Sequence, residues 1–117
     1  MKKSTLKNMT TITIMKSKNG EYKRVTCEGH AGYADAGEDI VCSAISILVI
    51  NTINSLDVLT DVQMEVTSDQ EKGLIDCRLI GNSDLSSTLL IDSMVLGLQN
   101  VVSQYGKQYL KLKFKEV

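Results

Sequence analysis

A histidine and a cysteine in the first half of the chain are the residues best suited to chemistry. His30 is the only histidine among the 117 residues, and Cys42, one of three cysteines, follows it by 12 positions. A thiolate is a strong nucleophile, and a nearby imidazole can take its proton and later protonate the leaving group. The pair therefore predicts an acyl-transfer site, provided that the fold brings the two side chains together.

The residues around Cys42 indicate how its thiol would be activated. Asp39 is of the type that caps helix N-termini, and an apolar run of helix length extends from Ile40 to about Leu56. Cys42 would then be the third residue of the helix, where free backbone N–H groups and the helix dipole favour the thiolate. The same N–H groups would stabilise an oxyanion.

Two other interpretations of these residues stay open at this point. Cysteine is among the most often buried residue types, so Cys42 would ordinarily be a structural thiol in an apolar helix. Alternatively, Cys27, His30 and Cys42 would bind a metal ion, with Asp35 or Asp39 supplying a carboxylate.

Hydrophobic periodicity predicts seven elements around this pair. Strands are expected at about 10–15, 22–28, 62–66, 75–79 and 110–114, and helices at about 40–56 and 85–105, the second capped by Ser83 or Asp84. Asn19-Gly20 predicts a hairpin turn between the first two strands. Residues 29–38, rich in glycine and alanine, are expected to form a mobile loop, and residues 1–8 a flexible leader.

The order ββαββαβ predicts an α+β sandwich with one domain over residues 9–117. The first helix is apolar nearly all round and should lie at the centre of the fold. The second is amphipathic and should pack with it on a five-stranded, mostly antiparallel sheet. Its predicted buried face comprises Leu85, Leu89, Met94, Leu98, Val101, Val102 and Tyr105. Cys27 and Cys77 lie in apolar strand patterns and are predicted to be core residues.

Composition excludes several functional classes. A net charge of −1 argues against direct nucleic-acid binding, and the lack of tryptophan with a single phenylalanine argues against an aromatic stacking platform. Three cysteines without an apolar signal segment predict a reducing, cytoplasmic location. The longest apolar run, 40–50, is interrupted by Ser43 and Ser46 and is shorter than a membrane span, so no membrane partner is expected.

One motif resembles a known family. Gly29-His30-Ala31, followed by Gly37-x-Asp39-Ile40-Val41-Cys42-Ser43-Ala44-x-Ser46, closely resembles the signature of the ribosomal-processing cysteine protease family, Prp. The resemblance covers nearly the whole chain from Met9, including its size, the opening hairpin and the order of elements. Ser43 stands where the family commonly has alanine, which replaces one small residue with another.

The resemblance implies a homodimeric, cytoplasmic cysteine protease without a metal or other cofactor. Such an enzyme would remove a short N-terminal extension from the large-subunit ribosomal protein number twenty-seven, cutting after an aromatic pair. The alternative is a non-catalytic ribosome-associated or ribosome-assembly binding module that uses residues 29–39 as a docking lid.

The resemblance also implies a role for each motif residue. Cys42 would be the nucleophile and His30 the general base and acid, with residues 31–38 closing over the substrate. Gly29 would leave room for the substrate or aim His30. Asp39 would cap the helix and orient His30, and Ser46, one helical turn beyond Cys42, would help to hold the site.

Overall fold

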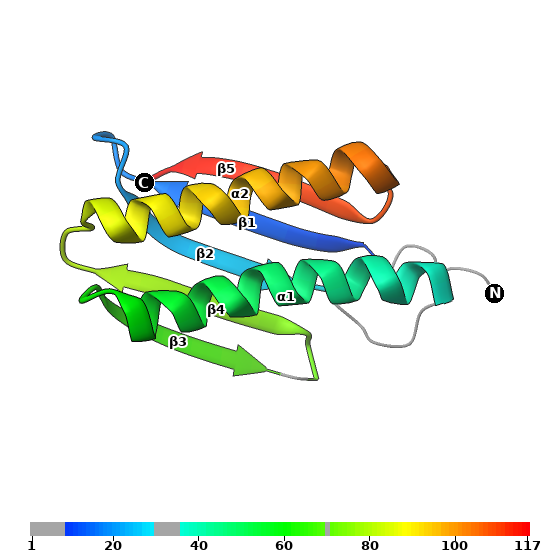
Figure 1. Cartoon of the computed structure of the whole chain (residues 1–117), viewed down its shortest axis with the longest axis horizontal. Helices are drawn as coiled ribbons and strands as arrows, with labels where there is room; N and C mark the ends of the chain where they lie inside the picture. The colour runs from blue at the N-terminus through cyan, green and yellow to red at the C-terminus, as the bar shows by residue number, and fades with distance from the viewer. Residues whose placement is uncertain (1–8, 30–35, 70) are drawn as a thin grey trace.

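The computed structural model describes residues 9–29, 36–69 and 71–117, which form a five-stranded sheet with two helices on one face (Figure 1). This two-layer architecture and its element order confirm the predicted α+β class. The elements are β1 (Thr10–Lys16), β2 (Tyr22–Glu28), α1 (Ala36–Leu59), β3 (Gln63–Asp69), β4 (Leu74–Ile80), α2 (Leu85–Tyr105) and β5 (Leu110–Glu116).

The strands lie in the order β3-β4-β2-β1-β5, and every neighbouring pair is antiparallel except β1 with β5. The register aligns Leu112, Ile12, Cys27 and Ile75 in one row across four strands. Because side chains alternate between the two faces of a strand, this register places one apolar set on a single face of the sheet. The helices cover that face and close the core (Figure 1).

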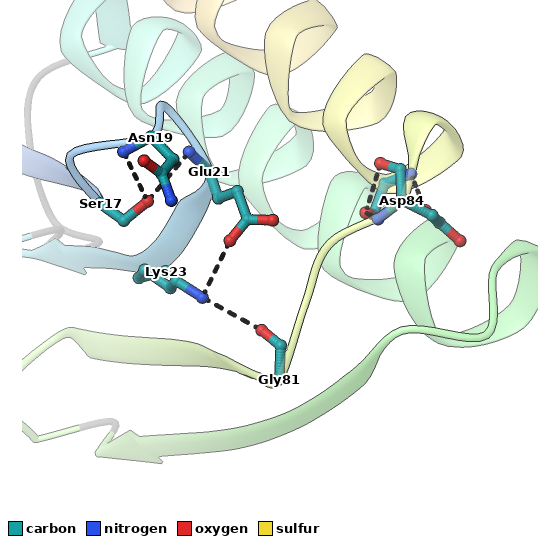
Figure 2. A network of polar contacts seen from close by, with 7 residues as sticks. Ser17, Asn19, Glu21, Lys23, Gly81 and Asp84 are labelled. Carbon is teal, nitrogen blue, oxygen red and sulfur yellow. Dashed lines mark hydrogen bonds and ion pairs between the residues drawn. The ribbon is translucent and has the colours of Figure 1, made fainter.

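The predicted hairpin turn joins β1 to β2. The Ser17 and Gly20 backbone N–H groups donate to Glu21 O and Ser17 O at 2.8 and 2.9 Å, and Gly20 has a φ of 84°. Figure 2 shows the Ser17 hydroxyl accepting from the N–H groups of Asn19 and Glu21, both at 3.3 Å. Lys23 Nζ donates to Gly81 O at 3.1 Å and thereby links β2 to the segment that precedes α2.

The second helix is capped by Asp84, one of the two caps that the sequence predicts, and the structure adds a capping box with Ser87. Ser87 N–H donates to Asp84 Oδ1 at 2.8 Å, and Asp84 N–H donates to Ser87 Oγ at 3.1 Å. These bonds satisfy backbone donors that a helix start otherwise leaves without partners. Gly106 ends the helix.

The predicted buried face of α2 is partly wrong. Leu85, Leu89 and Tyr105 are exposed, Leu85 by 89% and Leu89 by 68%. The face that packs on the core comprises Ser87, Ile91, Met94, Val95, Leu98 and Val101. The helix carries apolar residues on two sides, and only contact with the sheet and α1 decides which side is covered.

The first helix is not buried on all sides. Its buried residues are Val41, Ile45, Val49, Thr52 and Leu56, which recur at helical spacing on one face. Ile40 and Ile47 are 63% and 66% exposed. Because the helices form an outer layer, with the sheet on one side only, the second apolar face of α1 is uncovered in the single chain (Figure 1).

Both helices are long and apolar enough to cross a membrane, by length and composition alone. Ile40–Leu59 has a mean hydropathy of 1.6, and Leu85–Tyr105 has 1.3. The shorter apolar run 40–50, the only one considered from the sequence, did not predict that either helix reaches the length of a membrane span. Each helix buries one face against the same sheet, as core helices do (Figure 1).

Candidate active site

Cys42 is the seventh residue of α1, because the helix begins at Ala36. The predictions that Asp39 caps the helix and that residues 36–38 belong to a loop are therefore wrong. Alanine and glutamate form helices readily, and an acidic residue suits the first turn as well as the cap, so the helix extends upstream. Free N–H groups and the dipole act within the first turn, so their predicted effect on Cys42 is lost.

The three thiols differ in exposure. Cys27 and Cys77 are each 1% exposed, which confirms them as core residues, whereas Cys42 is half-buried. Burial, the neighbouring Cys42 and Glu28 raise the pKa of Cys27 to about 11. Burial and Asp76 raise the pKa of Cys77 to about 11 as well. Cys42 is thus the thiol that reaches the surface of the protein.

Cys42 lies on the flank of α1 that faces away from α2. Ser46 and Ile53 follow it by 4 and 11 residues, so the three share one flank of the helix. The opposite flank packs on α2, where a Cβ added to Gly97 would come within 2.9 Å of Leu48 Cδ2. The flank of Cys42 therefore points towards the β3–β4 side of the sheet, and Ser46 is half-buried on it.

Gly29 anchors the chain immediately before His30. Its N–H donates to Gly73 O at 3.1 Å, and its φ is +91°. A Cβ at this position would lie 2.7 Å from Met9 O, closer than such contacts normally occur. Since Cys42 contributes to the raised pKa of Cys27, two residues before Gly29, the thiol lies near this end of β2.

Several predicted features cannot be placed from these contacts. His30 and residues 31–35, including the candidate ligand Asp35, lie outside the described residues, as do residues 1–8 and the side chain of Asp39. Among the residues described, no group of three or more His, Cys, Asp or Glu side chains is arranged to hold a metal ion. The proposed metal set includes His30, so it is not tested by this observation.

A groove of about 310 Å³ lies between α1 and the β3–β4 hairpin, on the same flank as Cys42. Its apolar walls include Ile50, Ile53, Val66, Leu74 and Ile75. Sequence reasoning missed this site, because its walls come from three elements and no local pattern marks them.

The fold and the groove together define a small α+β protein in which a partly exposed thiol and an apolar cleft share one flank of a helix, a suitable architecture for a thiol-dependent hydrolase. The sequence model of the family Cysteine protease Prp matches residues 9–111, and the chain therefore belongs to this family of cysteine proteases. This match confirms the resemblance drawn from the His30–Cys42 motif.

Curated relatives carry the same family name. The chain is 25% identical over 107 residues to the Ribosomal processing cysteine protease Prp of Staphylococcus aureus, an alignment that covers 92% of this chain and 100% of the relative. It is 24% identical over 101 residues to the protein of that name in Bacillus subtilis, covering 83% and 90% of the two chains.

Solved structures share the fold. A crystal structure of the S. aureus protease Prp with a substrate peptide superposes with a TM-score of 0.83 at 24% identity, covering 91% of this chain and 99% of the other. A Streptococcus mutans protein superposes with a TM-score of 0.82 at 28% identity, covering 93% and 99%.

Proposed function

We propose that this protein is a cysteine endopeptidase that removes a short N-terminal extension from the large-subunit ribosomal protein number twenty-seven. The observation that carries the proposal is the position of Cys42. It is the thiol that reaches the surface and lies on the same flank of α1 as an apolar groove, in a member of a cysteine protease family. The names of the S. aureus and B. subtilis relatives support processing of a ribosomal protein.

The proposed reaction is acyl transfer in two steps. His30 takes the proton of the Cys42 thiol, and the thiolate attacks the carbonyl carbon of the scissile bond. His30 then protonates the departing amine, which leaves a thioester on Cys42. In the second step His30 deprotonates a water molecule, which attacks the thioester and releases the new carboxylate and the thiol.

The supporting residues keep their proposed roles, with one change. Gly29, bonded to Gly73, would fix the chain before His30, and Ser46 would help to hold the site from the same flank of α1. Asp39 lies in the first helical turn, so its proposed role is to orient His30 and no longer to cap the helix. Residues 31–35 would close over the substrate, and the enzyme would act in the cytoplasm within a single domain over residues 9–117.

Peptide cleavage tests the catalytic proposal. The probe is a synthetic peptide that spans the N-terminal extension of the ribosomal protein, with products followed by mass spectrometry. We expect one bond to be cut by the native chain and by Ser43→Ala, which alters the exposed neighbour of the thiol. Cys42→Ala and His30→Ala should cut none. Equal cleavage by Cys42→Ala would contradict the proposal, and binding without cleavage by every form would favour a docking module.

We also propose that the chain is a homodimer, as the family resemblance implies. The outer face of the helix layer exposes Ile40 and Ile47 on α1 and Leu89 and Leu96 on α2, each by more than 60%. Large apolar side chains left uncovered on both helices of one layer favour association through that layer. Sedimentation equilibrium should show a dimer that Leu89→Glu weakens. Val117→Glu, at an exposed apolar position outside the helix layer, should leave the dimer intact.

A further inference from the structure

We propose that the groove between α1 and the β3–β4 hairpin binds the substrate peptide, which lies extended along the free edge of β3. The peptide's apolar side chains would enter the groove, and its intervening side chains would lie on the open face of the sheet. This inference rests on the proposed function, since it assigns the groove to the peptide that Cys42 would cut.

The walls of the groove suit an apolar side chain. Ile50 and Val66 face it from α1 and β3 and are 45% and 44% exposed, so both present uncovered apolar surface. Leu74 and Ile75 add to the walls from β4. A volume of about 310 Å³ lies at the lower end of the range for binding pockets, which is about 300–1,000 Å³. Covering these side chains would remove apolar surface from water.

A single extended peptide is long enough to reach both the groove and Cys42. Ile50 and Ile53 follow Cys42 by 8 and 11 residues, which corresponds to about 12–17 Å along a helix axis. An extended peptide spans this distance in about four or five residues. Gly73, at the other wall, is bonded to Gly29, which directly precedes His30. Both walls of the groove are therefore continuous with segments that carry the proposed catalytic residues.

The neighbouring strand can hold an extended peptide. Within the described sheet β3 pairs only with β4, so its outer edge presents backbone groups suited to a further strand. A strand added there would alternate its side chains between the two faces of the sheet. Those on the helix side would lie beside Val66 and Ser68 and enter the groove.

The open face of β3 indicates which residues the peptide would carry between its apolar ones. Glu65 and Thr67 alternate with the groove residues Val66 and Ser68 and lie on the open face. Glu65 pairs with Arg78 at 3.9 Å and Thr67 is an uncharged polar residue, so both favour polar neighbours across the strand pair. The other edge strand, β5, instead carries Lys111, Lys113 and Lys115 on its open face, so it disfavours a basic peptide. The site would therefore recognise alternating apolar and polar residues.

Binding to an inactive chain tests the groove separately from catalysis. The probe is the fluorescent extension peptide, with its Kd measured by anisotropy on full-length Cys42→Ala. We expect the additional substitution Ile50→Asn to weaken binding about tenfold, the usual effect of losing one apolar contact. Ile80→Asn is the matched control, because Ile80 is 49% exposed but lies at the other end of β4. Val66→Thr, which keeps the side-chain shape, provides a second groove variant.

Peptide variants identify the side chain that enters the groove. Each apolar residue of the peptide is replaced by alanine in turn. One of these alanine replacements in the peptide should weaken its binding to Cys42→Ala. The same replacement should not weaken binding further to the double variant Cys42→Ala/Ile50→Asn, because both changes remove the same contact. Additive losses at every peptide position would place the peptide elsewhere.

Hydrogen exchange tests the strand addition. Peptide binding should slow exchange of backbone amides in β3, while those of β5, the other edge strand, should exchange as before. Protection confined to β5, or absent from both edges in the peptide complex, would overturn the strand addition.

The combined outcomes separate this inference from the proposed function. If the native chain cuts the peptide but Ile50→Asn and Val66→Thr bind it as well as Ile80→Asn does, the groove assignment is wrong and the protease stands. If the native chain does not cut a peptide whose binding depends on Ile50, the protease is wrong and the groove stands. A peptide that is neither bound nor cut overturns both.

Discussion

Replacing Gly29 with alanine should show how firmly the structure holds the chain before His30. Two features oppose a side chain at this position. The φ of +91° lies in a region that L-residues with a Cβ rarely adopt, and the new Cβ would meet Met9 O at 2.7 Å. The obstructing atom belongs to the backbone, so β1 or β2 would have to shift to accommodate the methyl group.

The two effects can be separated with a second glycine. Gly20 has a similar φ of +84°, but a Cβ there would have no neighbour within 4 Å. Gly20→Ala should therefore lower the free energy of unfolding only by the conformational cost, about 1 kcal/mol. Gly29→Ala adds the steric cost of overpacking, about 1–3 kcal/mol, for a total of about 3 kcal/mol. At about 4 °C per kcal/mol, the expected falls in Tm are about 4 °C and about 12 °C.

Guanidinium unfolding followed by circular dichroism would measure both losses, and peptide cleavage would measure the effect on activity. We expect Gly29→Ala to reduce kcat/KM more than Gly20→Ala at a temperature where both variants are folded, because a shift at Gly29 displaces the adjoining His30. Equal destabilisation by the two variants would refute the argument that contact with Met9 restrains this end of β2.

Three further predictions follow from other contacts. Iodoacetamide at pH 8 should alkylate Cys42 in the native protein and spare Cys27 and Cys77, because these two are buried and their pKa of about 11 leaves about 0.1% of each as thiolate. Peptide mass mapping that finds all three cysteines alkylated at equal rates would contradict this. Arg24 Nε and Nη2 donate to the Asp76 carboxylate at 2.9 and 2.5 Å, and these bonds are the main cause that lowers the pKa of Asp76. The pair should therefore stabilise the fold above about pH 4, and this stability is lost as the pH falls and the carboxylate is protonated. Thermal unfolding should accordingly show a smaller fall in Tm between pH 6 and pH 2 for Asp76→Asn than for the native chain, and an equal fall would remove the pair from the acid response. The Thr10 hydroxyl is buried without a hydrogen-bond partner among the described residues, so Thr10→Val should raise the free energy of unfolding by about 1 kcal/mol. A lower free energy of unfolding for Thr10→Val, measured by chemical denaturation, would show that the hydroxyl does have a hydrogen-bond partner.

The local elements were predictable wherever short-range chemistry decides them. The alternation from Tyr22 to Glu28 predicts β2 with the bounds that the structure has, and Asn19-Gly20 predicts its hairpin turn. Asp84 was predictable as a helix cap, because it can bond the N–H of Ser87 within its own turn. The start of α1 was predicted less well, since Asp39 suits the first turn and the cap equally.

The burial of particular side chains depends on what lies over them. Leu89 and Leu98 have the same residue type on the same helix, yet only Leu98 is buried. Likewise Cys42 shares its residue type with Cys27, and only the position of α1 above the sheet leaves Cys42 partly exposed. No residue type carries this information, because hydrophobic burial is non-directional and depends on which surfaces meet.

The amino-acid sequence by itself determined the α+β class, the element order and the motif that identifies Cys42 and His30 as candidates. The tertiary structure alone decided that β3 is a free edge, that the flank of Cys42 turns away from α2, and that Ile50 and Val66 face a common groove. Strand pairing and helix packing join residues far apart in the chain, whereas turns, caps and periodicity act between neighbours.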